Sequence, residues 1–357
     1  TLAVTEQSAN VRTGPPFVKL TTQDAQLVSE LPDAQESTVE KTRDALVDWV
    51  LPVAVGLLLA LGLVFLLEKL FPRVDTRDDI QDELGVPVLA EVPRVRTRKK
   101  LQPHSLDDLH GPDAEMYRSM RSRLEFIATT AHDPANGTST GTRDRRSEVI
   151  MIVSPTPAEG KTRSAAYLGL TYAEAGHEVA IFGCDFRRPK LHEYFGVDRD
   201  PGFGSLAVNG SVELDDVVKQ TDVEGLSIVP SGEPTNKTVP IVAAVSRLVG
   251  DARAEGVDVI IDTAPLLVAN DAADIVEFAD HVVMVVRAGK THLNAAKEAL
   301  EVLKRHDAPV AGVVVVASHP ADGGYYNYYR QYGYYRPPKE ARRSWVPWRR
   351  RAPSFEP

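Results

Sequence analysis

A short stretch at 160–162, Gly-Lys-Thr, carries residue types that can bind the phosphates of a nucleotide. It follows an apolar run at 149–153, which predicts a buried strand, and precedes a helical stretch that Gly176 ends. In a strand–loop–helix arrangement, backbone N–H groups and the positive end of the helix converge on an anion. Lys161 would add a charge for the β- and γ-phosphates, and the Thr162 hydroxyl would hold Mg²⁺. Since Gly-Lys-Thr is common by chance, the prediction depends on the strand and the helix beside it.

Two further apolar runs end in a carboxylate that can hold a divalent cation. Asp185 follows the run 179–184, and Asp262 follows the run 257–261. Ligands of a parallel sheet gather at the carboxyl ends of its strands, so we expect both side chains beside the phosphate loop, 154–162. Each can bind Mg²⁺ directly or through water. A helix cap is the alternative for a lone Asp at a strand end, but three coordinated features in one sheet favour the metal site.

The remaining apolar runs predict the fold that positions these groups. Short runs rich in Val and Ile alternate with helical segments, which indicates parallel strands covered on both faces. The expected strands after the phosphate loop are 178–182, 226–229, 257–261, 281–286 and 310–316, and the main helices between them are 239–254 and 293–306. Before the loop, a helix is expected at 113–128, with Asp113 as its cap. The predicted fold class is α/β, a doubly wound and mostly parallel sheet of the P-loop NTPase type, preceded by one transmembrane helix.

The transmembrane helix is expected at 49–67, a stretch without a charged residue. At about 1.5 Å per residue this length just crosses a hydrocarbon core of ~30 Å. The alternative is a buried core helix, but core helices of this length usually have a polar face. Because the nucleotide site needs cytosolic ATP, we expect a single span in the cell (inner/plasma) membrane, with the part after the span in the cytoplasm.

Composition and charge divide the chain into five segments. They are an extracytoplasmic remnant at 1–48, the transmembrane helix at 49–67, a juxtamembrane linker at 68–112, a P-loop nucleotide-binding domain at 113–318, and a tyrosine-rich and basic tail at 319–357. For the linker, a solvated connector and contact with anionic lipid both remain open. The formal net charge of −9 argues against general nucleic-acid binding.

Together these features resemble the bacterial tyrosine kinases (BY-kinases), which are fused to or partnered with chain-length determinants of capsular and exopolysaccharide synthesis. The resemblance covers 46–335. It rests on the apolar helix followed by LGVPVLAEVP at 84–93, an ExxRxxR pattern at 115–121, the Walker A loop at 154–162, and the sequences DFRRP at 185–189, DTAP at 262–265, DA at 271–272, VRAGKT at 286–291 and YYNYYRQYGYY at 325–335.

The resemblance implies roles for individual residues. Catalysis would depend on Lys161, Asp185, Asp262 and Arg187, and Mg²⁺ would be held by Thr162, Asp185 and Asp262. ATP would be bound by Thr156, Pro157, Ala158, Glu159, Gly160, Lys161, Thr162 and Arg163. The phosphoacceptors would be Tyr325, Tyr326, Tyr328, Tyr329, Tyr332, Tyr334 and Tyr335, and self-association would use Glu115, Arg118 and Arg121. From the residues alone, the last three are equally an exposed ion-pair ladder, and the tyrosine cluster is equally a low-complexity aromatic segment.

The resemblance also implies partners. In the family the tyrosines are phosphorylated by a neighbouring subunit in a ring, and the cycle regulates polysaccharide export. We therefore expect self-association in a ring, contact with the polysaccharide polymerase and export machinery, and contact with membrane lipid. Both ATP and Mg²⁺ are the expected cofactors.

Several departures from the family pattern fall in the chemistry. Gly183 stands where the second motif begins with Asp, and Ala158 replaces a usual Gly. If residue 158 has a positive φ, its Cβ costs roughly 1–2 kcal/mol. Arg163 replaces a small Thr, Ala264 replaces a Pro, and Ala317 stands where an Asn is frequent.

Three functions are therefore weighed. The first is a membrane-anchored tyrosine autokinase, a non-specific protein-tyrosine kinase by reaction, which regulates capsular and exopolysaccharide chain length and export. The second is a catalytically weakened, ATP-dependent scaffold of the same machinery. The third is a partitioning-type P-loop ATPase, which the apolar helix and the tyrosine tail disfavour. Because Gly183 replaces a carboxylate, the choice between the first two is open.

Overall fold

The computed structural model describes residues 49–70, 72–74, 77–94, 105–132, 146–208, 214–235 and 239–318. The chain divides into two compact units, Thr1–Leu70 and Phe71–Pro357. The predicted extracytoplasmic remnant at 1–48 and the tyrosine-rich tail at 319–357 lie outside the described residues.

The first unit contains α3 (Leu51–Leu70), in which no residue is buried. Among the described residues this is the one helix that is long and apolar enough to cross a membrane, judged by length and composition. The sequence predicted the apolar stretch at 49–67, and the helix adds one more turn that includes Glu68 and Lys69.

The second unit is built on an eight-stranded sheet in the order β1-β8-β7-β2-β6-β3-β5-β4. All neighbours pair in parallel except β4 and β5, which are antiparallel. The strands are β1 (Val88–Pro93), β2 (Val149–Val153), β3 (Val179–Cys184), β4 (Lys219–Gln220), β5 (Leu226–Val229), β6 (Asp258–Thr263), β7 (His281–Arg287) and β8 (Val310–Ser318). The prediction of a mostly parallel α/β sheet is confirmed.

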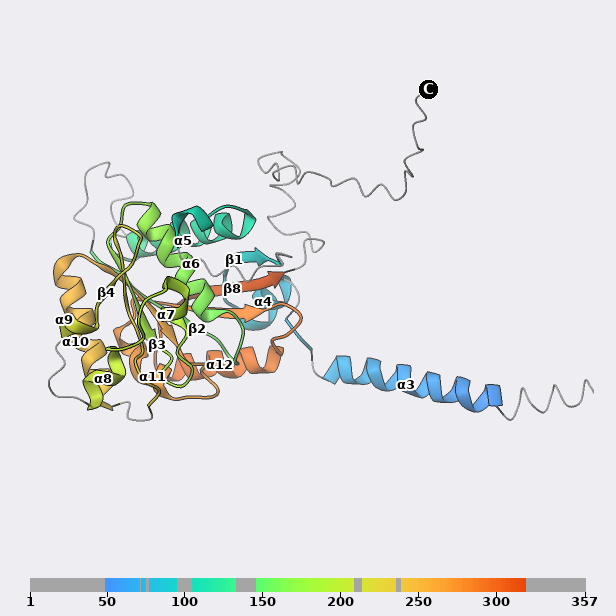
Figure 1. Ribbon diagram of the computed structural model, residues 1–357. Coiled ribbons are helices and arrows are strands. Elements are labelled where there is room, and N and C mark those ends of the chain that lie inside the picture. The colour runs from blue at the N-terminus through green and yellow to red at the C-terminus, as the bar shows by residue number, and fades with distance from the viewer. Residues whose placement is uncertain are drawn as a thin grey trace, which may run out of the picture. The chain divides into compact units, whose positions relative to one another are not determined.

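Helices cover both faces of this sheet, and Figure 1 shows α5 and α6 on the opposite side from α12. The helices of the unit are α4 (Arg77–Leu84), α5 (Pro112–His132), α6 (Lys161–Glu174), α7 (Leu191–Phe195), α8 (Phe203–Val208), α9 (Leu214–Val217), α10 (Val239–Glu255), α11 (Asp271–Ile275) and α12 (Leu293–Arg305), with single 3₁₀ turns at Leu106–Asp108 and Val276–Phe278. Alternate residues of the central strands point to the two faces. Ile150 and Ile152 of β2 therefore pack with α5 and α6, whereas Val149 and Met151 pack with α10 and α12.

Two differences from the predicted elements have local causes. The range 68–112, predicted as a linker, contains α4 and also β1, which pairs with β8 at the sheet edge. The strand is short and ends at Pro93, so its sequence has the appearance of a Pro-rich connector. The predicted helix at 113–128 begins instead at Pro112, so Asp113 lies inside the first turn and is not the cap.

A short extended segment, Pro72–Val74, lies against the loop between β7 and α12. Val74 is fully buried and exchanges two backbone hydrogen bonds with the loop: its N–H donates to Thr291 O at 2.9 Å, and its carbonyl accepts from Gly289 N at 3.0 Å. Arg73 also donates to Gly289 O at 3.0 Å. The residues just before α4 thus hold one side of this loop.

Candidate functional site

The phosphate loop connects the end of β2 to the first turn of α6, as predicted. Gly160 precedes the helix with φ of 101°, and Ala158 has φ of 61°. Positive φ at alternate positions directs successive N–H groups toward one side and forms a concave anion site. The predicted strain at Ala158 is therefore present, and its Cβ costs roughly 1–2 kcal/mol relative to glycine.

A buried carboxylate inside the loop holds its conformation. Glu159 is fully buried, and its carboxylate accepts hydrogen bonds from Thr156 N at 2.9 Å, Thr156 Oγ1 at 2.7 Å and Thr291 Oγ1 at 2.6 Å. The Ser154 hydroxyl donates to Thr156 O at 2.8 Å. Since a buried carboxylate needs several donors to offset its lost hydration, these three bonds give the Glu159 side chain a structural role in the loop. Binding of the cofactor by the Glu159 backbone stays a prediction.

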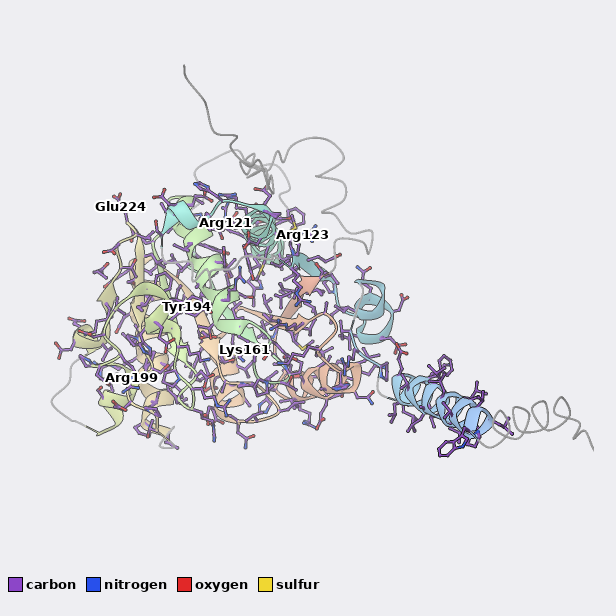
Figure 2. All side chains as sticks on the ribbon, turned by 45° about the vertical axis from the view of Figure 1, so that its right-hand side comes forward. Arg121, Arg123, Lys161, Tyr194, Arg199 and Glu224 are labelled. Carbon is purple, nitrogen blue, oxygen red and sulfur yellow. The ribbon has the colours of Figure 1, made fainter. Side chains whose placement is uncertain are left out.

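Lys161 begins α6 and is 6% exposed. Figure 2 shows that it comes from the start of this helix, inside the unit. Its Nζ donates to Ser154 Oγ at 3.1 Å. Burial lowers the pKa of Lys161, while the carboxylates of Asp262, Asp185 and Glu159 act in the opposite direction. A buried ammonium surrounded by acceptors is suited to receive a phosphate oxygen in place of its lost water.

Asp262 lies at the end of β6, directly beside the loop, and is 2% exposed. Burial raises its pKa to about 7, against the opposing effects of Lys161 and of a hydrogen bond from Thr162. Its Oδ1 is buried and has no hydrogen-bond partner in the described part of the chain. A buried oxygen without a donor fits a hard cation such as Mg²⁺, whose ligands are oxygens.

The residues that can hold Mg²⁺ do not form a complete cage. Among the described residues, no group of three or more His, Cys, Asp or Glu side chains is arranged to hold a metal ion. This pattern suits Mg²⁺, which keeps several waters and is usually bound by one or two carboxylates together with the phosphates of a substrate. Asp262 and Thr162 therefore fit a metal that arrives with a nucleotide.

Asp185 follows β3 at the same edge of the sheet. Its Oδ1 accepts from the backbone N–H groups of Arg187 at 3.3 Å and Arg188 at 3.0 Å, so it also stabilises its own turn. The Arg187 side chain donates to Asp271 Oδ2 at 3.3 Å, and Asp271 is buried at the start of α11. The structure thus brings Asp185, Asp262 and Lys161 to one edge, and places Arg187 in an ion pair with the predicted Asp-Ala motif.

Gly183 is directly beside Asp262 in the pairing of β3 with β6. A Cβ at Gly183 would lie 3.0 Å from Ser231 Oγ, 3.2 Å from Ser231 N and 3.3 Å from Val229 O. A side chain at residue 183 would therefore be crowded by Ser231, which follows β5 and is 3% exposed. Sequence reasoning found the missing carboxylate but not this neighbour, because the contact joins residues far apart in the chain.

The loop between β7 and α12, 288–292, braces the phosphate loop from outside. Lys290 Nζ donates to Pro157 O at 2.8 Å and to Ala158 O at 3.2 Å, and Arg287 Nη1 donates to Ala158 O at 3.4 Å. The VRAGKT stretch at 286–291 is part of the family resemblance, but no role for Lys290 was predicted from it. Lys290 follows the apolar strand β7, and this position is the sequence signal that could have placed it at the carboxyl edge of the sheet.

Arg163 was predicted to bind the cofactor, but its side chain is directed to α5. Its Nη2 donates to Asp113 Oδ2 at 3.0 Å, and its guanidinium lies 5.1 Å from the ring centroid of Tyr167. Tyr167 also donates to Asp113 and stacks on Tyr117, with ring centroids 5.0 Å apart. A role of Arg163 in cofactor binding through its backbone stays a prediction.

The three residues predicted for self-association all make contacts within the chain. Arg118 donates to both carboxylate oxygens of Glu174, each at 2.7 Å, and to Glu115 at 3.1 Å. Arg121, labelled on α5 in Figure 2, donates to Glu125 at 2.9 Å. The bidentate pair ties α5 to the end of α6, whose first turn carries Lys161.

The chain is similar to bacterial proteins named as tyrosine-protein kinases, so the resemblance predicted from the sequence is confirmed. EpsB of Ralstonia nicotianae, a candidate tyrosine-protein kinase by its name, is 29% identical over 294 residues, which cover 79% of this chain and 37% of EpsB. The tyrosine-protein kinase ptk of Acinetobacter johnsonii is 27% identical over 288 residues, covering 77% of this chain and 37% of ptk. The chain therefore spans little more than a third of the length of these relatives. No protein-family model matches it.

Solved structures show the same fold. The chimeric protein CapA2B2 aligns with a TM-score of 0.58 at 26% identity, covering 68% of this chain and all of CapA2B2. The kinase domain of Escherichia coli tyrosine kinase ETK aligns with a TM-score of 0.60 at 21% identity, covering 70% of this chain and 96% of that domain. At this identity the second likeness supports the fold alone.

Proposed function

We propose that this chain is a membrane-anchored, ATP-binding protein of the bacterial tyrosine kinase type, which phosphorylates its own tyrosines. The observation that carries the proposal is the buried group at the end of β2 and β6. There the loop with positive φ at residues 158 and 160, the Lys161 ammonium and a carboxyl oxygen of Asp262 without a donor lie at one edge of the sheet, and the charges of Lys161 and Asp262 act on each other's pKa. These are the parts that phosphoryl transfer needs, because its catalysis consists mainly of positioning and charge stabilisation.

Each residue has a distinct task in this proposal. The N–H groups of the loop and Lys161 would bind the β- and γ-phosphates, and Thr162, Asp185 and Asp262 would hold Mg²⁺, whose positive charge would offset that of the phosphates. Transfer breaks the bond between the γ-phosphorus and its bridging oxygen, joins the phosphorus to a tyrosine oxygen, and leaves ADP and one phenol proton. In the metal-free protein burial raises the pKa of Asp262 to about 7. As a ligand of Mg²⁺ Asp262 would be ionised, whereas as the general base it would accept the phenol proton and leave the metal to Thr162 and Asp185.

Location and partners follow from the resemblance and from α3. An apolar helix of 20 residues without a buried side chain is long enough to span a bilayer and would place the site at the inner face of the cell membrane. The acceptors would be the seven tyrosines at 325–335, outside the described residues. Ring self-association, contact with lipid, and regulation of capsular or exopolysaccharide chain length and export belong to the same proposal.

A second candidate function is an ATP-dependent scaffold that binds nucleotide without phosphoryl transfer. Two observations favour it. Ser231 crowds the space beside Gly183, where the family resemblance implies an Asp, and Ala158 holds a strained conformation in the phosphate loop. Both change the site without removing Lys161, Thr162 or Asp262, so nucleotide binding would persist while transfer is weakened.

Phosphorylation of the tail is the expected result that separates the two candidates. The 357-residue chain, purified in detergent, would be incubated with ATP and Mg²⁺ and its phosphotyrosines mapped by mass spectrometry. Phosphate at 325–335 that is lost in Lys161→Met, by about 100-fold or more, supports the kinase, because the ammonium contributes to transition-state charge stabilisation.

The matched control is Lys304→Met, which removes the same charge from the exposed face of α12. It should leave phosphorylation unchanged. ATP binding without phosphotyrosine would support the scaffold, and the absence of ATP binding in the unaltered chain would contradict both candidates.

A further inference from the structure

We propose that Lys290 is a positioning residue, which holds the phosphate loop in its anion-binding conformation by binding two of its carbonyl groups from outside the site. This inference rests on the proposed nucleotide site and adds a residue to it. Lys290 donates to the carbonyls of Pro157 and Ala158, the two residues at the strained part of the loop.

The geometry of the peptide group explains how an outer contact acts on the inner face. In a planar trans peptide, the C=O and N–H groups point in opposite directions. The Pro157 carbonyl shares a peptide with Ala158 N–H, and the Ala158 carbonyl shares one with Glu159 N–H. A cation that holds both carbonyls on the outside therefore turns both N–H groups toward the concave side, where an anion binds.

Ala158 has a φ of 61°, a value that residues with a Cβ rarely adopt. With alanine at this position, the loop has a competing relaxed conformation in which φ is negative. Two charge-assisted hydrogen bonds that exist only in the strained conformation oppose this change. The contacts of Lys290 thus compensate for the missing glycine, and Arg287 adds a weaker contact to the same Ala158 carbonyl.

Lys290 is exposed at its surface, but its backbone is fixed on both sides. Thr291 is buried, and its hydroxyl donates to Glu159 of the loop and accepts from Arg287 N at 2.8 Å. Gly289 and Thr291 both bond to the backbone of Val74. The ammonium group therefore extends from an anchored turn, which reduces the entropy lost when it binds the carbonyls.

A double-mutant cycle tests the inference on the full chain in detergent. Lys290→Met should weaken Mg²⁺-ATP affinity, measured by calorimetry, about tenfold when residue 158 is alanine. The same substitution should weaken it threefold or less in the Ala158→Gly background, because glycine adopts the loop conformation without strain. Lys290→Arg should retain affinity within about threefold, since a guanidinium can also donate to two carbonyls. Lys304→Met is the control for charge.

The outcomes separate this inference from the proposed function. An equal loss in both backgrounds would mean that Lys290 binds the phosphates directly, and no loss would mean that it has no role; either result overturns the inference. Hydrogen exchange of the loop amides of Thr156 and of residues 158–160, measured without nucleotide, gives a second test. Lys290→Met should speed their exchange at least several-fold in the alanine background, and unchanged exchange would contradict the inference even if the chain bound no ATP.

Discussion

At pH 8, Asp262→Asn is expected to raise the melting temperature of the nucleotide-free protein and to weaken Mg²⁺-dependent ATP binding by about 100-fold or more. Burial raises the pKa of Asp262 from 3.8 to about 7, so the folded state binds a proton that the unfolded state releases. The stability from this group is fully present below pH 3.8 and is lost as the pH rises through 7. Asparagine has the same shape and carries no charge that must be buried.

The measurement is thermal unfolding at pH 5 and pH 8 for both proteins. For the unaltered protein, the free energy of unfolding is expected to fall from pH 5 to pH 8 by an amount on the order of 2–4 kcal/mol. The melting temperature should fall by roughly 5–10 °C. In Asp262→Asn this contribution disappears, while all other titrating groups remain and serve as the internal reference. An identical pH dependence in the two proteins would show that Asp262 is not protonated in the folded state. Tight Mg²⁺-ATP binding by the variant would remove Asp262 from the metal site.

The second large effect is expected from Gly183→Asp, which supplies the carboxylate that the family resemblance implies at this position. By itself this change should destabilise the nucleotide-free protein by roughly 3–5 kcal/mol, because it buries a charge beside Asp262. The new side chain also meets Ser231 Oγ, since even a Cβ at residue 183 would lie 3.0 Å from that atom. Phosphotyrosine formation is therefore not expected to rise in the single variant.

Two companion variants separate crowding from charge. Gly183→Ala adds only the Cβ and should cost about 1–3 kcal/mol, as overpacking does. Gly183→Asp combined with Ser231→Gly removes the crowding hydroxyl and should recover stability, most clearly with Mg²⁺ and ATP present. Denaturant unfolding measures the stabilities, and phosphotyrosine mapping measures the chemistry. If the single Gly183→Asp variant is as stable as the unaltered protein, Ser231 does not occupy the position of the carboxylate.

Features with a local signal were predicted well from the sequence. Short, mostly apolar runs identified β2 and β5 with the bounds that the structure shows, because a strand buried on both faces has few polar residues. The phosphate loop and Asp262 were found because each directly follows a buried strand in the sequence. A parallel sheet brings the ends of such strands to one edge. The strain at Ala158 was inferred from the residue type that usually stands there, and its positive φ confirms it.

Features that depend on distant contacts were not predicted. β1 is a short edge strand, and it exists because β8 offers a parallel partner more than two hundred residues later. Ser231 lies beside Gly183, and Lys290 binds carbonyl groups of the phosphate loop. Both contacts join residues that are far apart in the sequence. Arg163 shows the opposite case: a charged residue beside a phosphate loop suggested ligand binding, yet Asp113 and Tyr167 bind its side chain. Ala317 also has a positive φ of 58°, a conformation that Asn adopts more readily than Ala.

The pairing of Val74 with Gly289 and Thr291 determines where a soluble fragment should begin. A fragment cut after α3, starting at residue 71, keeps this short backbone ladder and with it the anchored turn that carries Lys290. A cut at residue 75 falls within the predicted linker at 68–112, but it removes the fully buried Val74 side chain and leaves Gly289 N without its acceptor. Fragments that differ by four residues are thus not equivalent preparations for assays of nucleotide binding.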